Sequence, residues 1–207
     1  MFPSGSRVYP ITDVHLTGLS HSEQVARLID GGATLIQLRE KQLSPQEFFL
    51  QADEAVRFAH QRGARVIIND RVDVALAVKA DGVHLGQDDM AASGARELLG
   101  QKALIGLSTH NLAQAVRAIA QPIDYIAIGP VFTTTSKTDP DPALGLEGIR
   151  EVRRRVGEFP LIAIGGITLD NAPAVFDAGA DSVALISALL AYPSQITAKT
   201  VQFLGLT

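Results

Sequence analysis

Short apolar segments rich in β-branched residues recur eight times along the chain, and each is followed by a longer segment whose apolar residues have helical spacing. The expected strands are residues 8–12, 34–39, 65–69, 82–85, 103–107, 125–128, 161–164 and 182–186. The expected helices are residues 20–30, 45–62, 72–80, 91–99, 111–120, 146–156, 170–178 and 188–203. Several strand segments are apolar at consecutive positions, which is typical of parallel strands buried on both faces. The pattern predicts an α/β fold.

The length of the chain suits eight strand–helix units in one closed sheet. Its 207 residues provide about 26 residues for each unit, enough for one strand, one short helix and short loops. We therefore expect a single-domain (β/α)8 TIM barrel over residues 1–207, with a doubly wound open sheet as the alternative. Similar junctions before several strands, such as residues 80–82 and 179–182, form a weak internal repeat.

Helix start signals support some of these expected elements. Ser44, Pro45 and Glu47 combine a capping hydroxyl, a first-turn proline and a capping-box acid. We expect Asp170 to cap the helix that follows it in a similar way.

Composition and charge argue against several classes of partner. Lys and Arg number 18 against 22 Asp and Glu, so the formal net charge is −4 and nucleic-acid binding is not expected. No apolar stretch approaches the roughly 20 residues of a membrane-spanning helix, so we expect no membrane partner. The chain contains no Cys and no signal-peptide pattern near its first residues, which favours the cytoplasm.

Polar or glycine residues follow nearly every expected strand, which predicts one working face at the carboxyl ends of the strands. Gln37, Arg39 and Lys41 are spaced by two, so their side chains are expected to point the same way on an extended segment. Two cations and an amide in a barrel mouth predict a phosphate or diphosphate partner. In the alternative reading, Lys41 is solvated and Arg39 pairs with a nearby carboxylate.

Carboxylates follow the third and fourth expected strands. Asn69 and Asp70 end one strand, and Asp88 and Asp89 follow the next, so two carboxylates from neighbouring strands could reach one hard cation. Mg²⁺ is the expected ion, because it takes one or two protein carboxylates together with water and phosphate oxygens. The alternative is that these aspartates only cap the helices that follow them.

The segment after the fifth strand holds Ser108 and His110. Because the sequence shows no adjacent nucleophile and carboxylate, we interpret His110 as a hydrogen-bonded structural residue rather than a general base. His84 is interpreted as a satisfied residue of the barrel wall. The remaining histidines, His15, His21 and His60, are expected at the surface.

Two further segments are candidates for anion binding. Residues 132–145 form a connection longer than a plain turn, and their hydroxyl run ends at Lys137, so we expect a functional lid that grips an anion; a solvated turn is the alternative. Gly165 and Gly166 follow the seventh strand and Ser187 follows the eighth, where barrels commonly bind phosphate. A tight turn without a ligand is the alternative there.

Several motifs occur in an order that resembles the thiamine-phosphate synthase family over nearly the whole chain. They are residues 9–13 (YPITD), 37–41 (QLREK), 68–71 (INDR), 81–89 (DGVHLGQDD), 106–110 (GLSTH), 129–137 (GPVFTTTSK), 165–167 (GGI) and 186–187 (IS). The resemblance implies a transferase that joins hydroxymethylpyrimidine diphosphate to hydroxyethylthiazole phosphate, with Mg²⁺, and releases pyrophosphate.

The resemblance also implies a role for each matching residue. The implied metal ligands are Asp70 and Asp89. The implied diphosphate ligands are Arg39, Lys41, Asn69, Ser108 and Lys137, of which Arg39, Lys41, Ser108 and Lys137 would assist catalysis. The implied pyrimidine contact is Gln37, and the implied thiazole-phosphate contacts are Thr134, Ser136, Gly166, Ile186 and Ser187.

Three alternatives remain open on the same barrel. Thiazole tautomerases share much of the thiazole-phosphate site; Asp70 and Asp89 favour the synthase, while His110 leaves tautomerase activity open. A non-catalytic regulatory protein that binds thiazole phosphate and a sugar-phosphate epimerase are the others. The expected partners are small-molecule substrates, and the sequence leaves open whether the chain forms a homo-oligomer.

Overall fold

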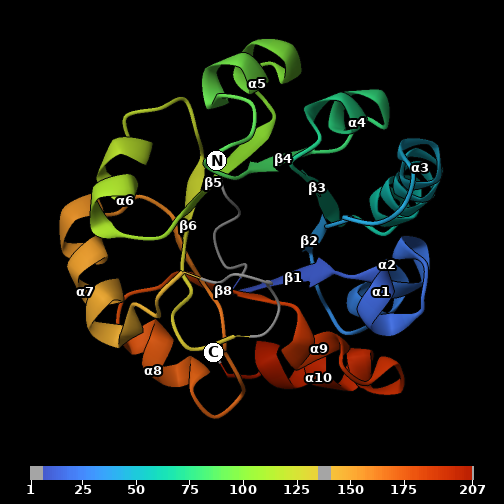
Figure 1. Ribbon diagram of the computed structural model, residues 1–207. Coiled ribbons are helices and arrows are strands. Elements are labelled where there is room, and N and C mark those ends of the chain that lie inside the picture. The colour runs from blue at the N-terminus through green and yellow to red at the C-terminus, as the bar shows by residue number, and fades with distance from the viewer. Residues whose placement is uncertain (1–6, 135–140, 207) are drawn as a thin grey trace.

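The computed structural model describes residues 7–134 and 141–206, in which eight parallel strands form a closed barrel. The strands pair in chain order, and β1 closes the barrel against β8. Helices surround the barrel on the outside (Figure 1). The expected (β/α)8 barrel is confirmed, and the open-sheet alternative is wrong because both edges of the sheet pair with each other.

The strands lie close to their expected bounds. They are β1 (Val8–Thr12), β2 (Leu35–Leu38), β3 (Arg65–Asn69), β4 (Gly82–Leu85), β5 (Leu104–Thr109), β6 (Tyr125–Ile128), β7 (Leu161–Ile164) and β8 (Ser182–Leu185). The helices are α1 (Val14–Thr17), α2 (His21–Asp30), α3 (Pro45–Gln61), α4 (Val72–Ala77), α5 (Ala92–Leu99), α6 (Leu112–Ala118), α7 (Gly145–Val156), α8 (Ala172–Asp177), α9 (Ser187–Leu190), the 3-10 helix η1 (Pro193–Gln195) and α10 (Ile196–Leu204). Across these described residues, no helix combines the length and apolarity needed to cross a bilayer.

Alternating residues of each strand contribute to two separate apolar clusters. In β2, Leu35 belongs to the cluster inside the barrel, together with Tyr9 and Tyr125. Its neighbour Ile36 belongs to the larger cluster between the strands and the surrounding helices. Because both faces of each strand are covered, the strands are apolar at consecutive positions, as the sequence pattern indicated.

Two expected features of the helices are wrong. The helix expected over residues 188–203 is split into α9, η1 and α10, because Pro193 follows the end of α9 and cannot donate a helical hydrogen bond. Asp170 does not cap α8; the cap position is Asn171, whose side chain instead accepts from the Thr168 N–H and donates to the Gly166 carbonyl. The capping box of Ser44 and Glu47 is confirmed.

Three aspartates at the amino-terminal face of the barrel tie neighbouring strands and helices together. Asp81, Asp124 and Asp181 directly precede β4, β6 and β8, and each Oδ2 accepts a backbone N–H from the start of the preceding strand at 2.8, 2.9 and 2.8 Å. The same oxygens contact a cationic or imidazole side chain on α3, α5 and α7, namely His60, Arg96 and Arg153. The repeated junctions in the sequence at 80–82 and 179–182 are therefore two copies of one structural clamp.

We expect Asp124→Ala to lower the free energy of unfolding by about 3 kcal/mol, because it leaves the buried Arg96 guanidinium and the Ile105 N–H without their shared acceptor. Asp73→Ala is the matched control, since it removes an exposed Arg71–Asp73 pair and should cost less than about 1 kcal/mol. Urea unfolding curves would measure both values, and equal losses would contradict the clamp.

Candidate active site

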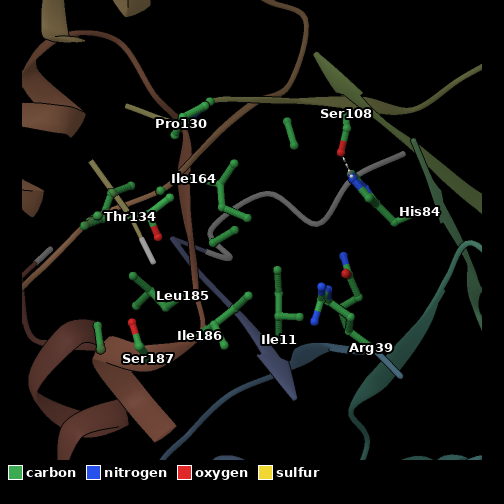
Figure 2. Close-up of a pocket in the computed structure, with 18 of the residues that line it drawn as sticks. Ile11, Arg39, His84, Ser108, Pro130, Thr134, Ile164, Leu185, Ile186 and Ser187 are labelled. Carbon is green, nitrogen blue, oxygen red and sulfur yellow. Dashed lines mark hydrogen bonds between the residues drawn. The ribbon is translucent and has the colours of Figure 1, made fainter. Parts of the chain in front are cut away.

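A pocket of about 510 Å³ opens at the carboxyl ends of the strands. Figure 2 shows Arg39, His84 and Ser108 on one side of this pocket and Thr134 and Ser187 on the opposite side. Ile11 and Ile164 lie between the two polar sides (Figure 2). The pocket can therefore hold a molecule with a polar group at each end and an apolar middle.

Most of the sequence-predicted binding residues meet in this pocket. Those that line it are Gln37, Arg39, Asn69, Ser108, Thr134, Gly166, Ile186 and Ser187. Lys41, Asp70 and Asp89 lie beside it rather than in its lining. Ser136 and Lys137 fall outside the described residues, as do residues 135–140 of the expected lid.

The cationic part of the site is not one extended segment. β2 ends at Leu38, so Gln37 is a strand residue while Arg39 and Lys41 belong to the loop that follows. Gln37 and Arg39 both line the pocket, but the Lys41 Nζ lies 2.5 Å from Asp70 Oδ2 outside its lining. The prediction that all three side chains point the same way is therefore wrong for Lys41. The alternation of strand side chains on which the prediction relied ends at Leu38, three residues before Lys41.

Arg39 and Lys41 each face a carboxylate. The Arg39 guanidinium lies 3.6 Å from the Asp13 carboxylate, as the alternative reading expected. Both ion pairs remain partly exposed, with Lys41 retaining 53% of its side-chain exposure. Such pairs are weak in water, so both cations can turn toward a polyanion that enters the mouth.

Asp70 and Asp89 lie close together after the neighbouring strands β3 and β4. Partial burial raises the pKa of the Asp89 carboxyl; the Gly86 N–H lowers this pKa, and the adjacent Asp70 raises it again. Neither aspartate caps a helix, because the cap positions of α4 and α5 are Arg71 and Ala91, and neither helix has a side-chain cap. The capping alternative is therefore wrong for both.

This pair of carboxylates suits a hard divalent cation. The two acids repel each other, and a cation between them would relieve that repulsion. In the described part of the chain, no group of three His, Cys, Asp or Glu side chains could hold a metal ion. Two carboxylates with water and phosphate oxygens are the ligand set that Mg²⁺ takes in proteins.

A chain of hydrogen bonds crosses the buried floor of the pocket. Gln37 Nε2 lies 3.1 Å from the Tyr9 hydroxyl, which lies 2.9 Å from the Tyr125 hydroxyl. His84 then joins Tyr125 to Ser108 through contacts of 3.1 and 2.9 Å. This chain of hydrogen bonds thus joins two predicted substrate contacts, Gln37 and Ser108, beneath the pocket.

Burial keeps the two phenols of this chain protonated. It raises the pKa of Tyr9 above its ordinary value, although the hydrogen bonds with Gln37 and Tyr125 oppose the shift. Burial and the adjacent Tyr9 raise the pKa of Tyr125 in the same way. The floor of the pocket is therefore polar but uncharged at these two positions, and His84 is the satisfied wall residue that the sequence predicted. Tyr9 and Tyr125 were not predicted as site residues, although both lie within predicted strands.

The predicted positions of the histidines are only partly confirmed. His110 lines the pocket and is hydrogen-bonded as expected, with its Nδ1 2.8 Å from the Gly129 carbonyl. The Asp141 carboxylate lies 3.4 Å from the same nitrogen, so a purely structural role for His110 stays a prediction. His15 and His60 are exposed as expected. The surface prediction for His21 is wrong, because α2 turns this side chain inward between Thr12 and Glu40, where its exposure is 0%.

The opposite side of the pocket depends on two glycines after β7. Gly165 and Gly166 have φ angles of 102° and 65°, and a Cβ on Gly166 would lie 2.7 Å from both the Phe132 Cβ and the Thr133 carbonyl oxygen. The Phe132 N–H donates to the Gly165 carbonyl, which ties the start of the 132–145 segment to β7. Ser187 begins α9 and lies on the same side of the pocket as Thr134 (Figure 2).

A model of the thiamine monophosphate synthase family matches residues 8–189. The chain belongs to this family. It is 45% identical over 201 residues to a thiamine-phosphate synthase of Chloroflexus aurantiacus, covering 97% of this chain and 92% of that one. A thiamine-phosphate synthase of Methanospirillum hungatei is 46% identical over 200 residues, covering 96% of each chain.

Solved structures of similar proteins agree with this family and with the barrel. The thiamine phosphate pyrophosphorylase of Pyrococcus furiosus superposes with a TM-score of 0.87 at 35% identity, covering 98% of this chain and 96% of that one. A structure described as native KDPGal superposes with a TM-score of 0.75 at 16% identity, over 100% of this chain and 96% of that one, and shows the shared fold alone. Members of the thiamine monophosphate synthase family are transferases, and this chain is a thiamine-phosphate synthase by family.

Proposed function

We propose that this chain joins 4-amino-2-methyl-5-hydroxymethylpyrimidine diphosphate to hydroxyethylthiazole phosphate, forming thiamine phosphate and releasing pyrophosphate. The observation that carries the proposal is the two-sided mouth of the barrel. Arg39, Lys41 and the two aspartates gather on one side, and the glycine turn and Ser187 lie on the other. Two phosphorylated substrates with rings between them fit this arrangement.

The diphosphate is assigned to the side formed after β2, β3 and β4. Arg39, Lys41, Asn69 and Ser108 bind its oxygens in this proposal, with Lys137 from the loop after β6. Asp70 and Asp89 would hold Mg²⁺, which would supply positive charge beside the leaving pyrophosphate. Gln37 contacts the pyrimidine ring from the floor of the pocket, where its hydrogen bond with Tyr9 holds the amide in place.

The reaction needs no protein nucleophile. The bond between the pyrimidine methylene carbon and the diphosphate oxygen breaks, and its electron pair leaves with pyrophosphate. The aminopyrimidine ring stabilises the resulting cation, and the thiazole nitrogen donates its lone pair to form the new carbon–nitrogen bond. Arg39 and Lys41 act by stabilising the charge that develops on the leaving group, and the pocket acts by aligning the two rings.

The thiazole phosphate is assigned to the side formed after β6, β7 and β8. Its proposed contacts are Thr134, Ser136, Gly166, Ile186 and Ser187. Because glycine has no side chain, the Gly166 backbone can approach a phosphate closely. The apolar side chains of Ile11 and Ile164 lie between the two polar sides and leave little room for bulk water near the reacting atoms.

We further infer that residues 1–207 act as one catalytic domain on small-molecule substrates. Both substrates carry phosphate groups and do not cross membranes freely, so we place the enzyme in the cytoplasm with them. The proposal includes no nucleic-acid partner, in keeping with the net charge of −4.

Purified protein incubated with both substrates is expected to release pyrophosphate and form thiamine phosphate in equal amounts, and only when Mg²⁺ is present. Chromatography would quantify thiamine phosphate, and a coupled assay would quantify pyrophosphate. Thiazole isomerisation without condensation would support the tautomerase alternative. Binding of thiazole phosphate without either reaction would support the regulatory alternative, and both outcomes would overturn the synthase proposal.

A further inference from the structure

The loop that carries Arg39 and Lys41 is organised around the Glu40 carboxylate. Its Oε1 accepts the backbone N–H groups of the next three residues, Lys41, Gln42 and Leu43, at 2.7, 2.6 and 3.0 Å. One oxygen atom therefore fixes the backbone conformation of the loop between β2 and α3. A sharp turn is fixed here by a side chain rather than by a glycine or proline.

The other Glu40 oxygen points inward. Oε2 lies 3.4 Å from Nε2 of the buried His21, and the Glu40 side chain keeps 7% of its exposure, against 21% for Arg39 and 53% for Lys41. His21 Nδ1 lies 2.8 Å from the Thr12 hydroxyl, and that hydroxyl accepts the Arg39 N–H at 3.3 Å. The Arg39 backbone is therefore held from β1, and the Glu40 carboxylate that accepts the Lys41 N–H is itself held from α2.

Neighbouring groups also keep the Glu40 carboxyl ionised. Burial alone would raise the pKa of this carboxyl, but the contact with His21 and the three backbone N–H groups outweigh burial and lower the pKa to about 2. Glu40 is therefore ionised throughout the working range of an enzyme. The negative charge of Glu40 points inward and is surrounded by N–H groups. It therefore repels an anion bound at Arg39 and Lys41 less than an exposed carboxylate would.

We propose that Glu40 is a positioning residue for the diphosphate half of the reaction, holding the turn from which Arg39 and Lys41 reach the leaving group. This inference rests on the proposed function, because it takes the anion at this side of the mouth to be a diphosphate. Glu40 itself does not line the pocket.

Two roles of Glu40 predict opposite effects of Glu40→Gln on anion binding. If Glu40 acted only as a nearby negative charge, removing the charge would tighten the binding of pyrophosphate. If Glu40 positions the two cations, the loss of charge-assisted hydrogen bonds in the turn would weaken that binding. The sign of the change therefore separates the two roles.

We expect Glu40→Gln to raise the dissociation constant of pyrophosphate by about tenfold, measured by calorimetry without Mg²⁺. The KM for the pyrimidine diphosphate should rise by a similar factor. The KM for thiazole phosphate should stay within about twofold of wild type, because its proposed contact Ser187 lies across the pocket from Arg39 (Figure 2). A general loss of structure would change both KM values.

Glu47→Gln is the matched control. The Glu47 carboxylate also accepts a backbone N–H, that of Ser44, at 3.0 Å. It lies at the exposed start of α3 and makes none of the contacts that hold Arg39 and Lys41. Glu47→Gln therefore removes the same charge as Glu40→Gln, seven residues further along the chain. Both KM values and the pyrophosphate affinity of Glu47→Gln should match wild type.

Thermal melting of each variant precedes these measurements. If Glu40→Gln is unfolded at the assay temperature, Glu40→Asp takes its place, because it keeps the charge but is too short to reach all three N–H groups. Pyrophosphate affinity should then fall by about threefold, again without a change in the KM for thiazole phosphate. Unchanged or tighter pyrophosphate binding, or equal changes in both KM values, would overturn the inference. Failure of the wild-type protein to make thiamine phosphate would overturn the proposed function instead.

Discussion

Asp70→Asn is expected to lower Mg²⁺-dependent turnover by about three orders of magnitude, which corresponds to about 4 kcal/mol of lost transition-state stabilisation. The carboxylate contacts the Lys41 ammonium and lies beside Asp89, so its loss removes a proposed metal ligand and an ion pair together. Asn is the suitable replacement because Asp70 has a φ of 61°, a left-handed conformation that Asn tolerates well. The variant should therefore fold normally.

Steady-state kinetics over a Mg²⁺ titration would measure this loss, and Asp89→Asn should behave similarly. Asp88→Asn is the control, because Asp88 is an exposed carboxylate in the same turn. Thiazole-phosphate affinity should remain close to wild type in all three variants. Turnover near wild type in Asp70→Asn and Asp89→Asn would refute the metal assignment.

Gly166→Ala is expected to raise the KM for thiazole phosphate by about a hundredfold. The added Cβ would lie 2.7 Å from the Phe132 Cβ and from the Thr133 carbonyl oxygen, so the start of the 132–145 segment must shift. That shift would displace Thr134 and fill the space that a phosphate needs beside the Gly166 backbone. Pyrophosphate affinity should change by less than about twofold, since the cationic side of the mouth is untouched.

Gly157→Ala separates this steric effect from backbone strain. Gly157 has a φ of 61°, close to the 65° of Gly166, but no atom lies within 4 Å of its added Cβ. Both substitutions place an alanine at a positive φ, at Gly157 together with a ψ of −128° that side chains rarely adopt, and only the one at Gly166 produces a clash. Equal kinetic effects in the two variants would show that strain, and not the phosphate site, explains the result.

The fold could be predicted because its main signals are local. Consecutive apolar residues in each strand reflect burial on both faces, and the capping box at Ser44 and Glu47 marks the start of α3 within four residues. The break in the last expected helix was missed, although Pro193 signals it. The apolar residues on either side of Pro193 have the spacing of one continuous helix, and this spacing conceals the break.

The candidate site could be predicted in outline for a related reason. Parallel strands place all their carboxyl ends at one mouth, so Arg39, Asn69, Ser108 and Gly166 come together once the barrel is assumed. The chemistry of each residue type then indicates a phosphate or a cation. The inward position of His21 could not be predicted in this way, because α2 could have presented it to solvent.

The sequence by itself determined the eight strands, the order in which they follow one another and the residues at their carboxyl ends, because strand burial and helix capping act over a few neighbouring residues. Only the tertiary structure decided which of those residues meet. The chain of hydrogen bonds from Gln37 through Tyr9 and Tyr125 to His84 and Ser108 joins side chains up to 116 positions apart. Such contacts depend on the closure of the barrel, which brings distant strands to face one another across a shared interior.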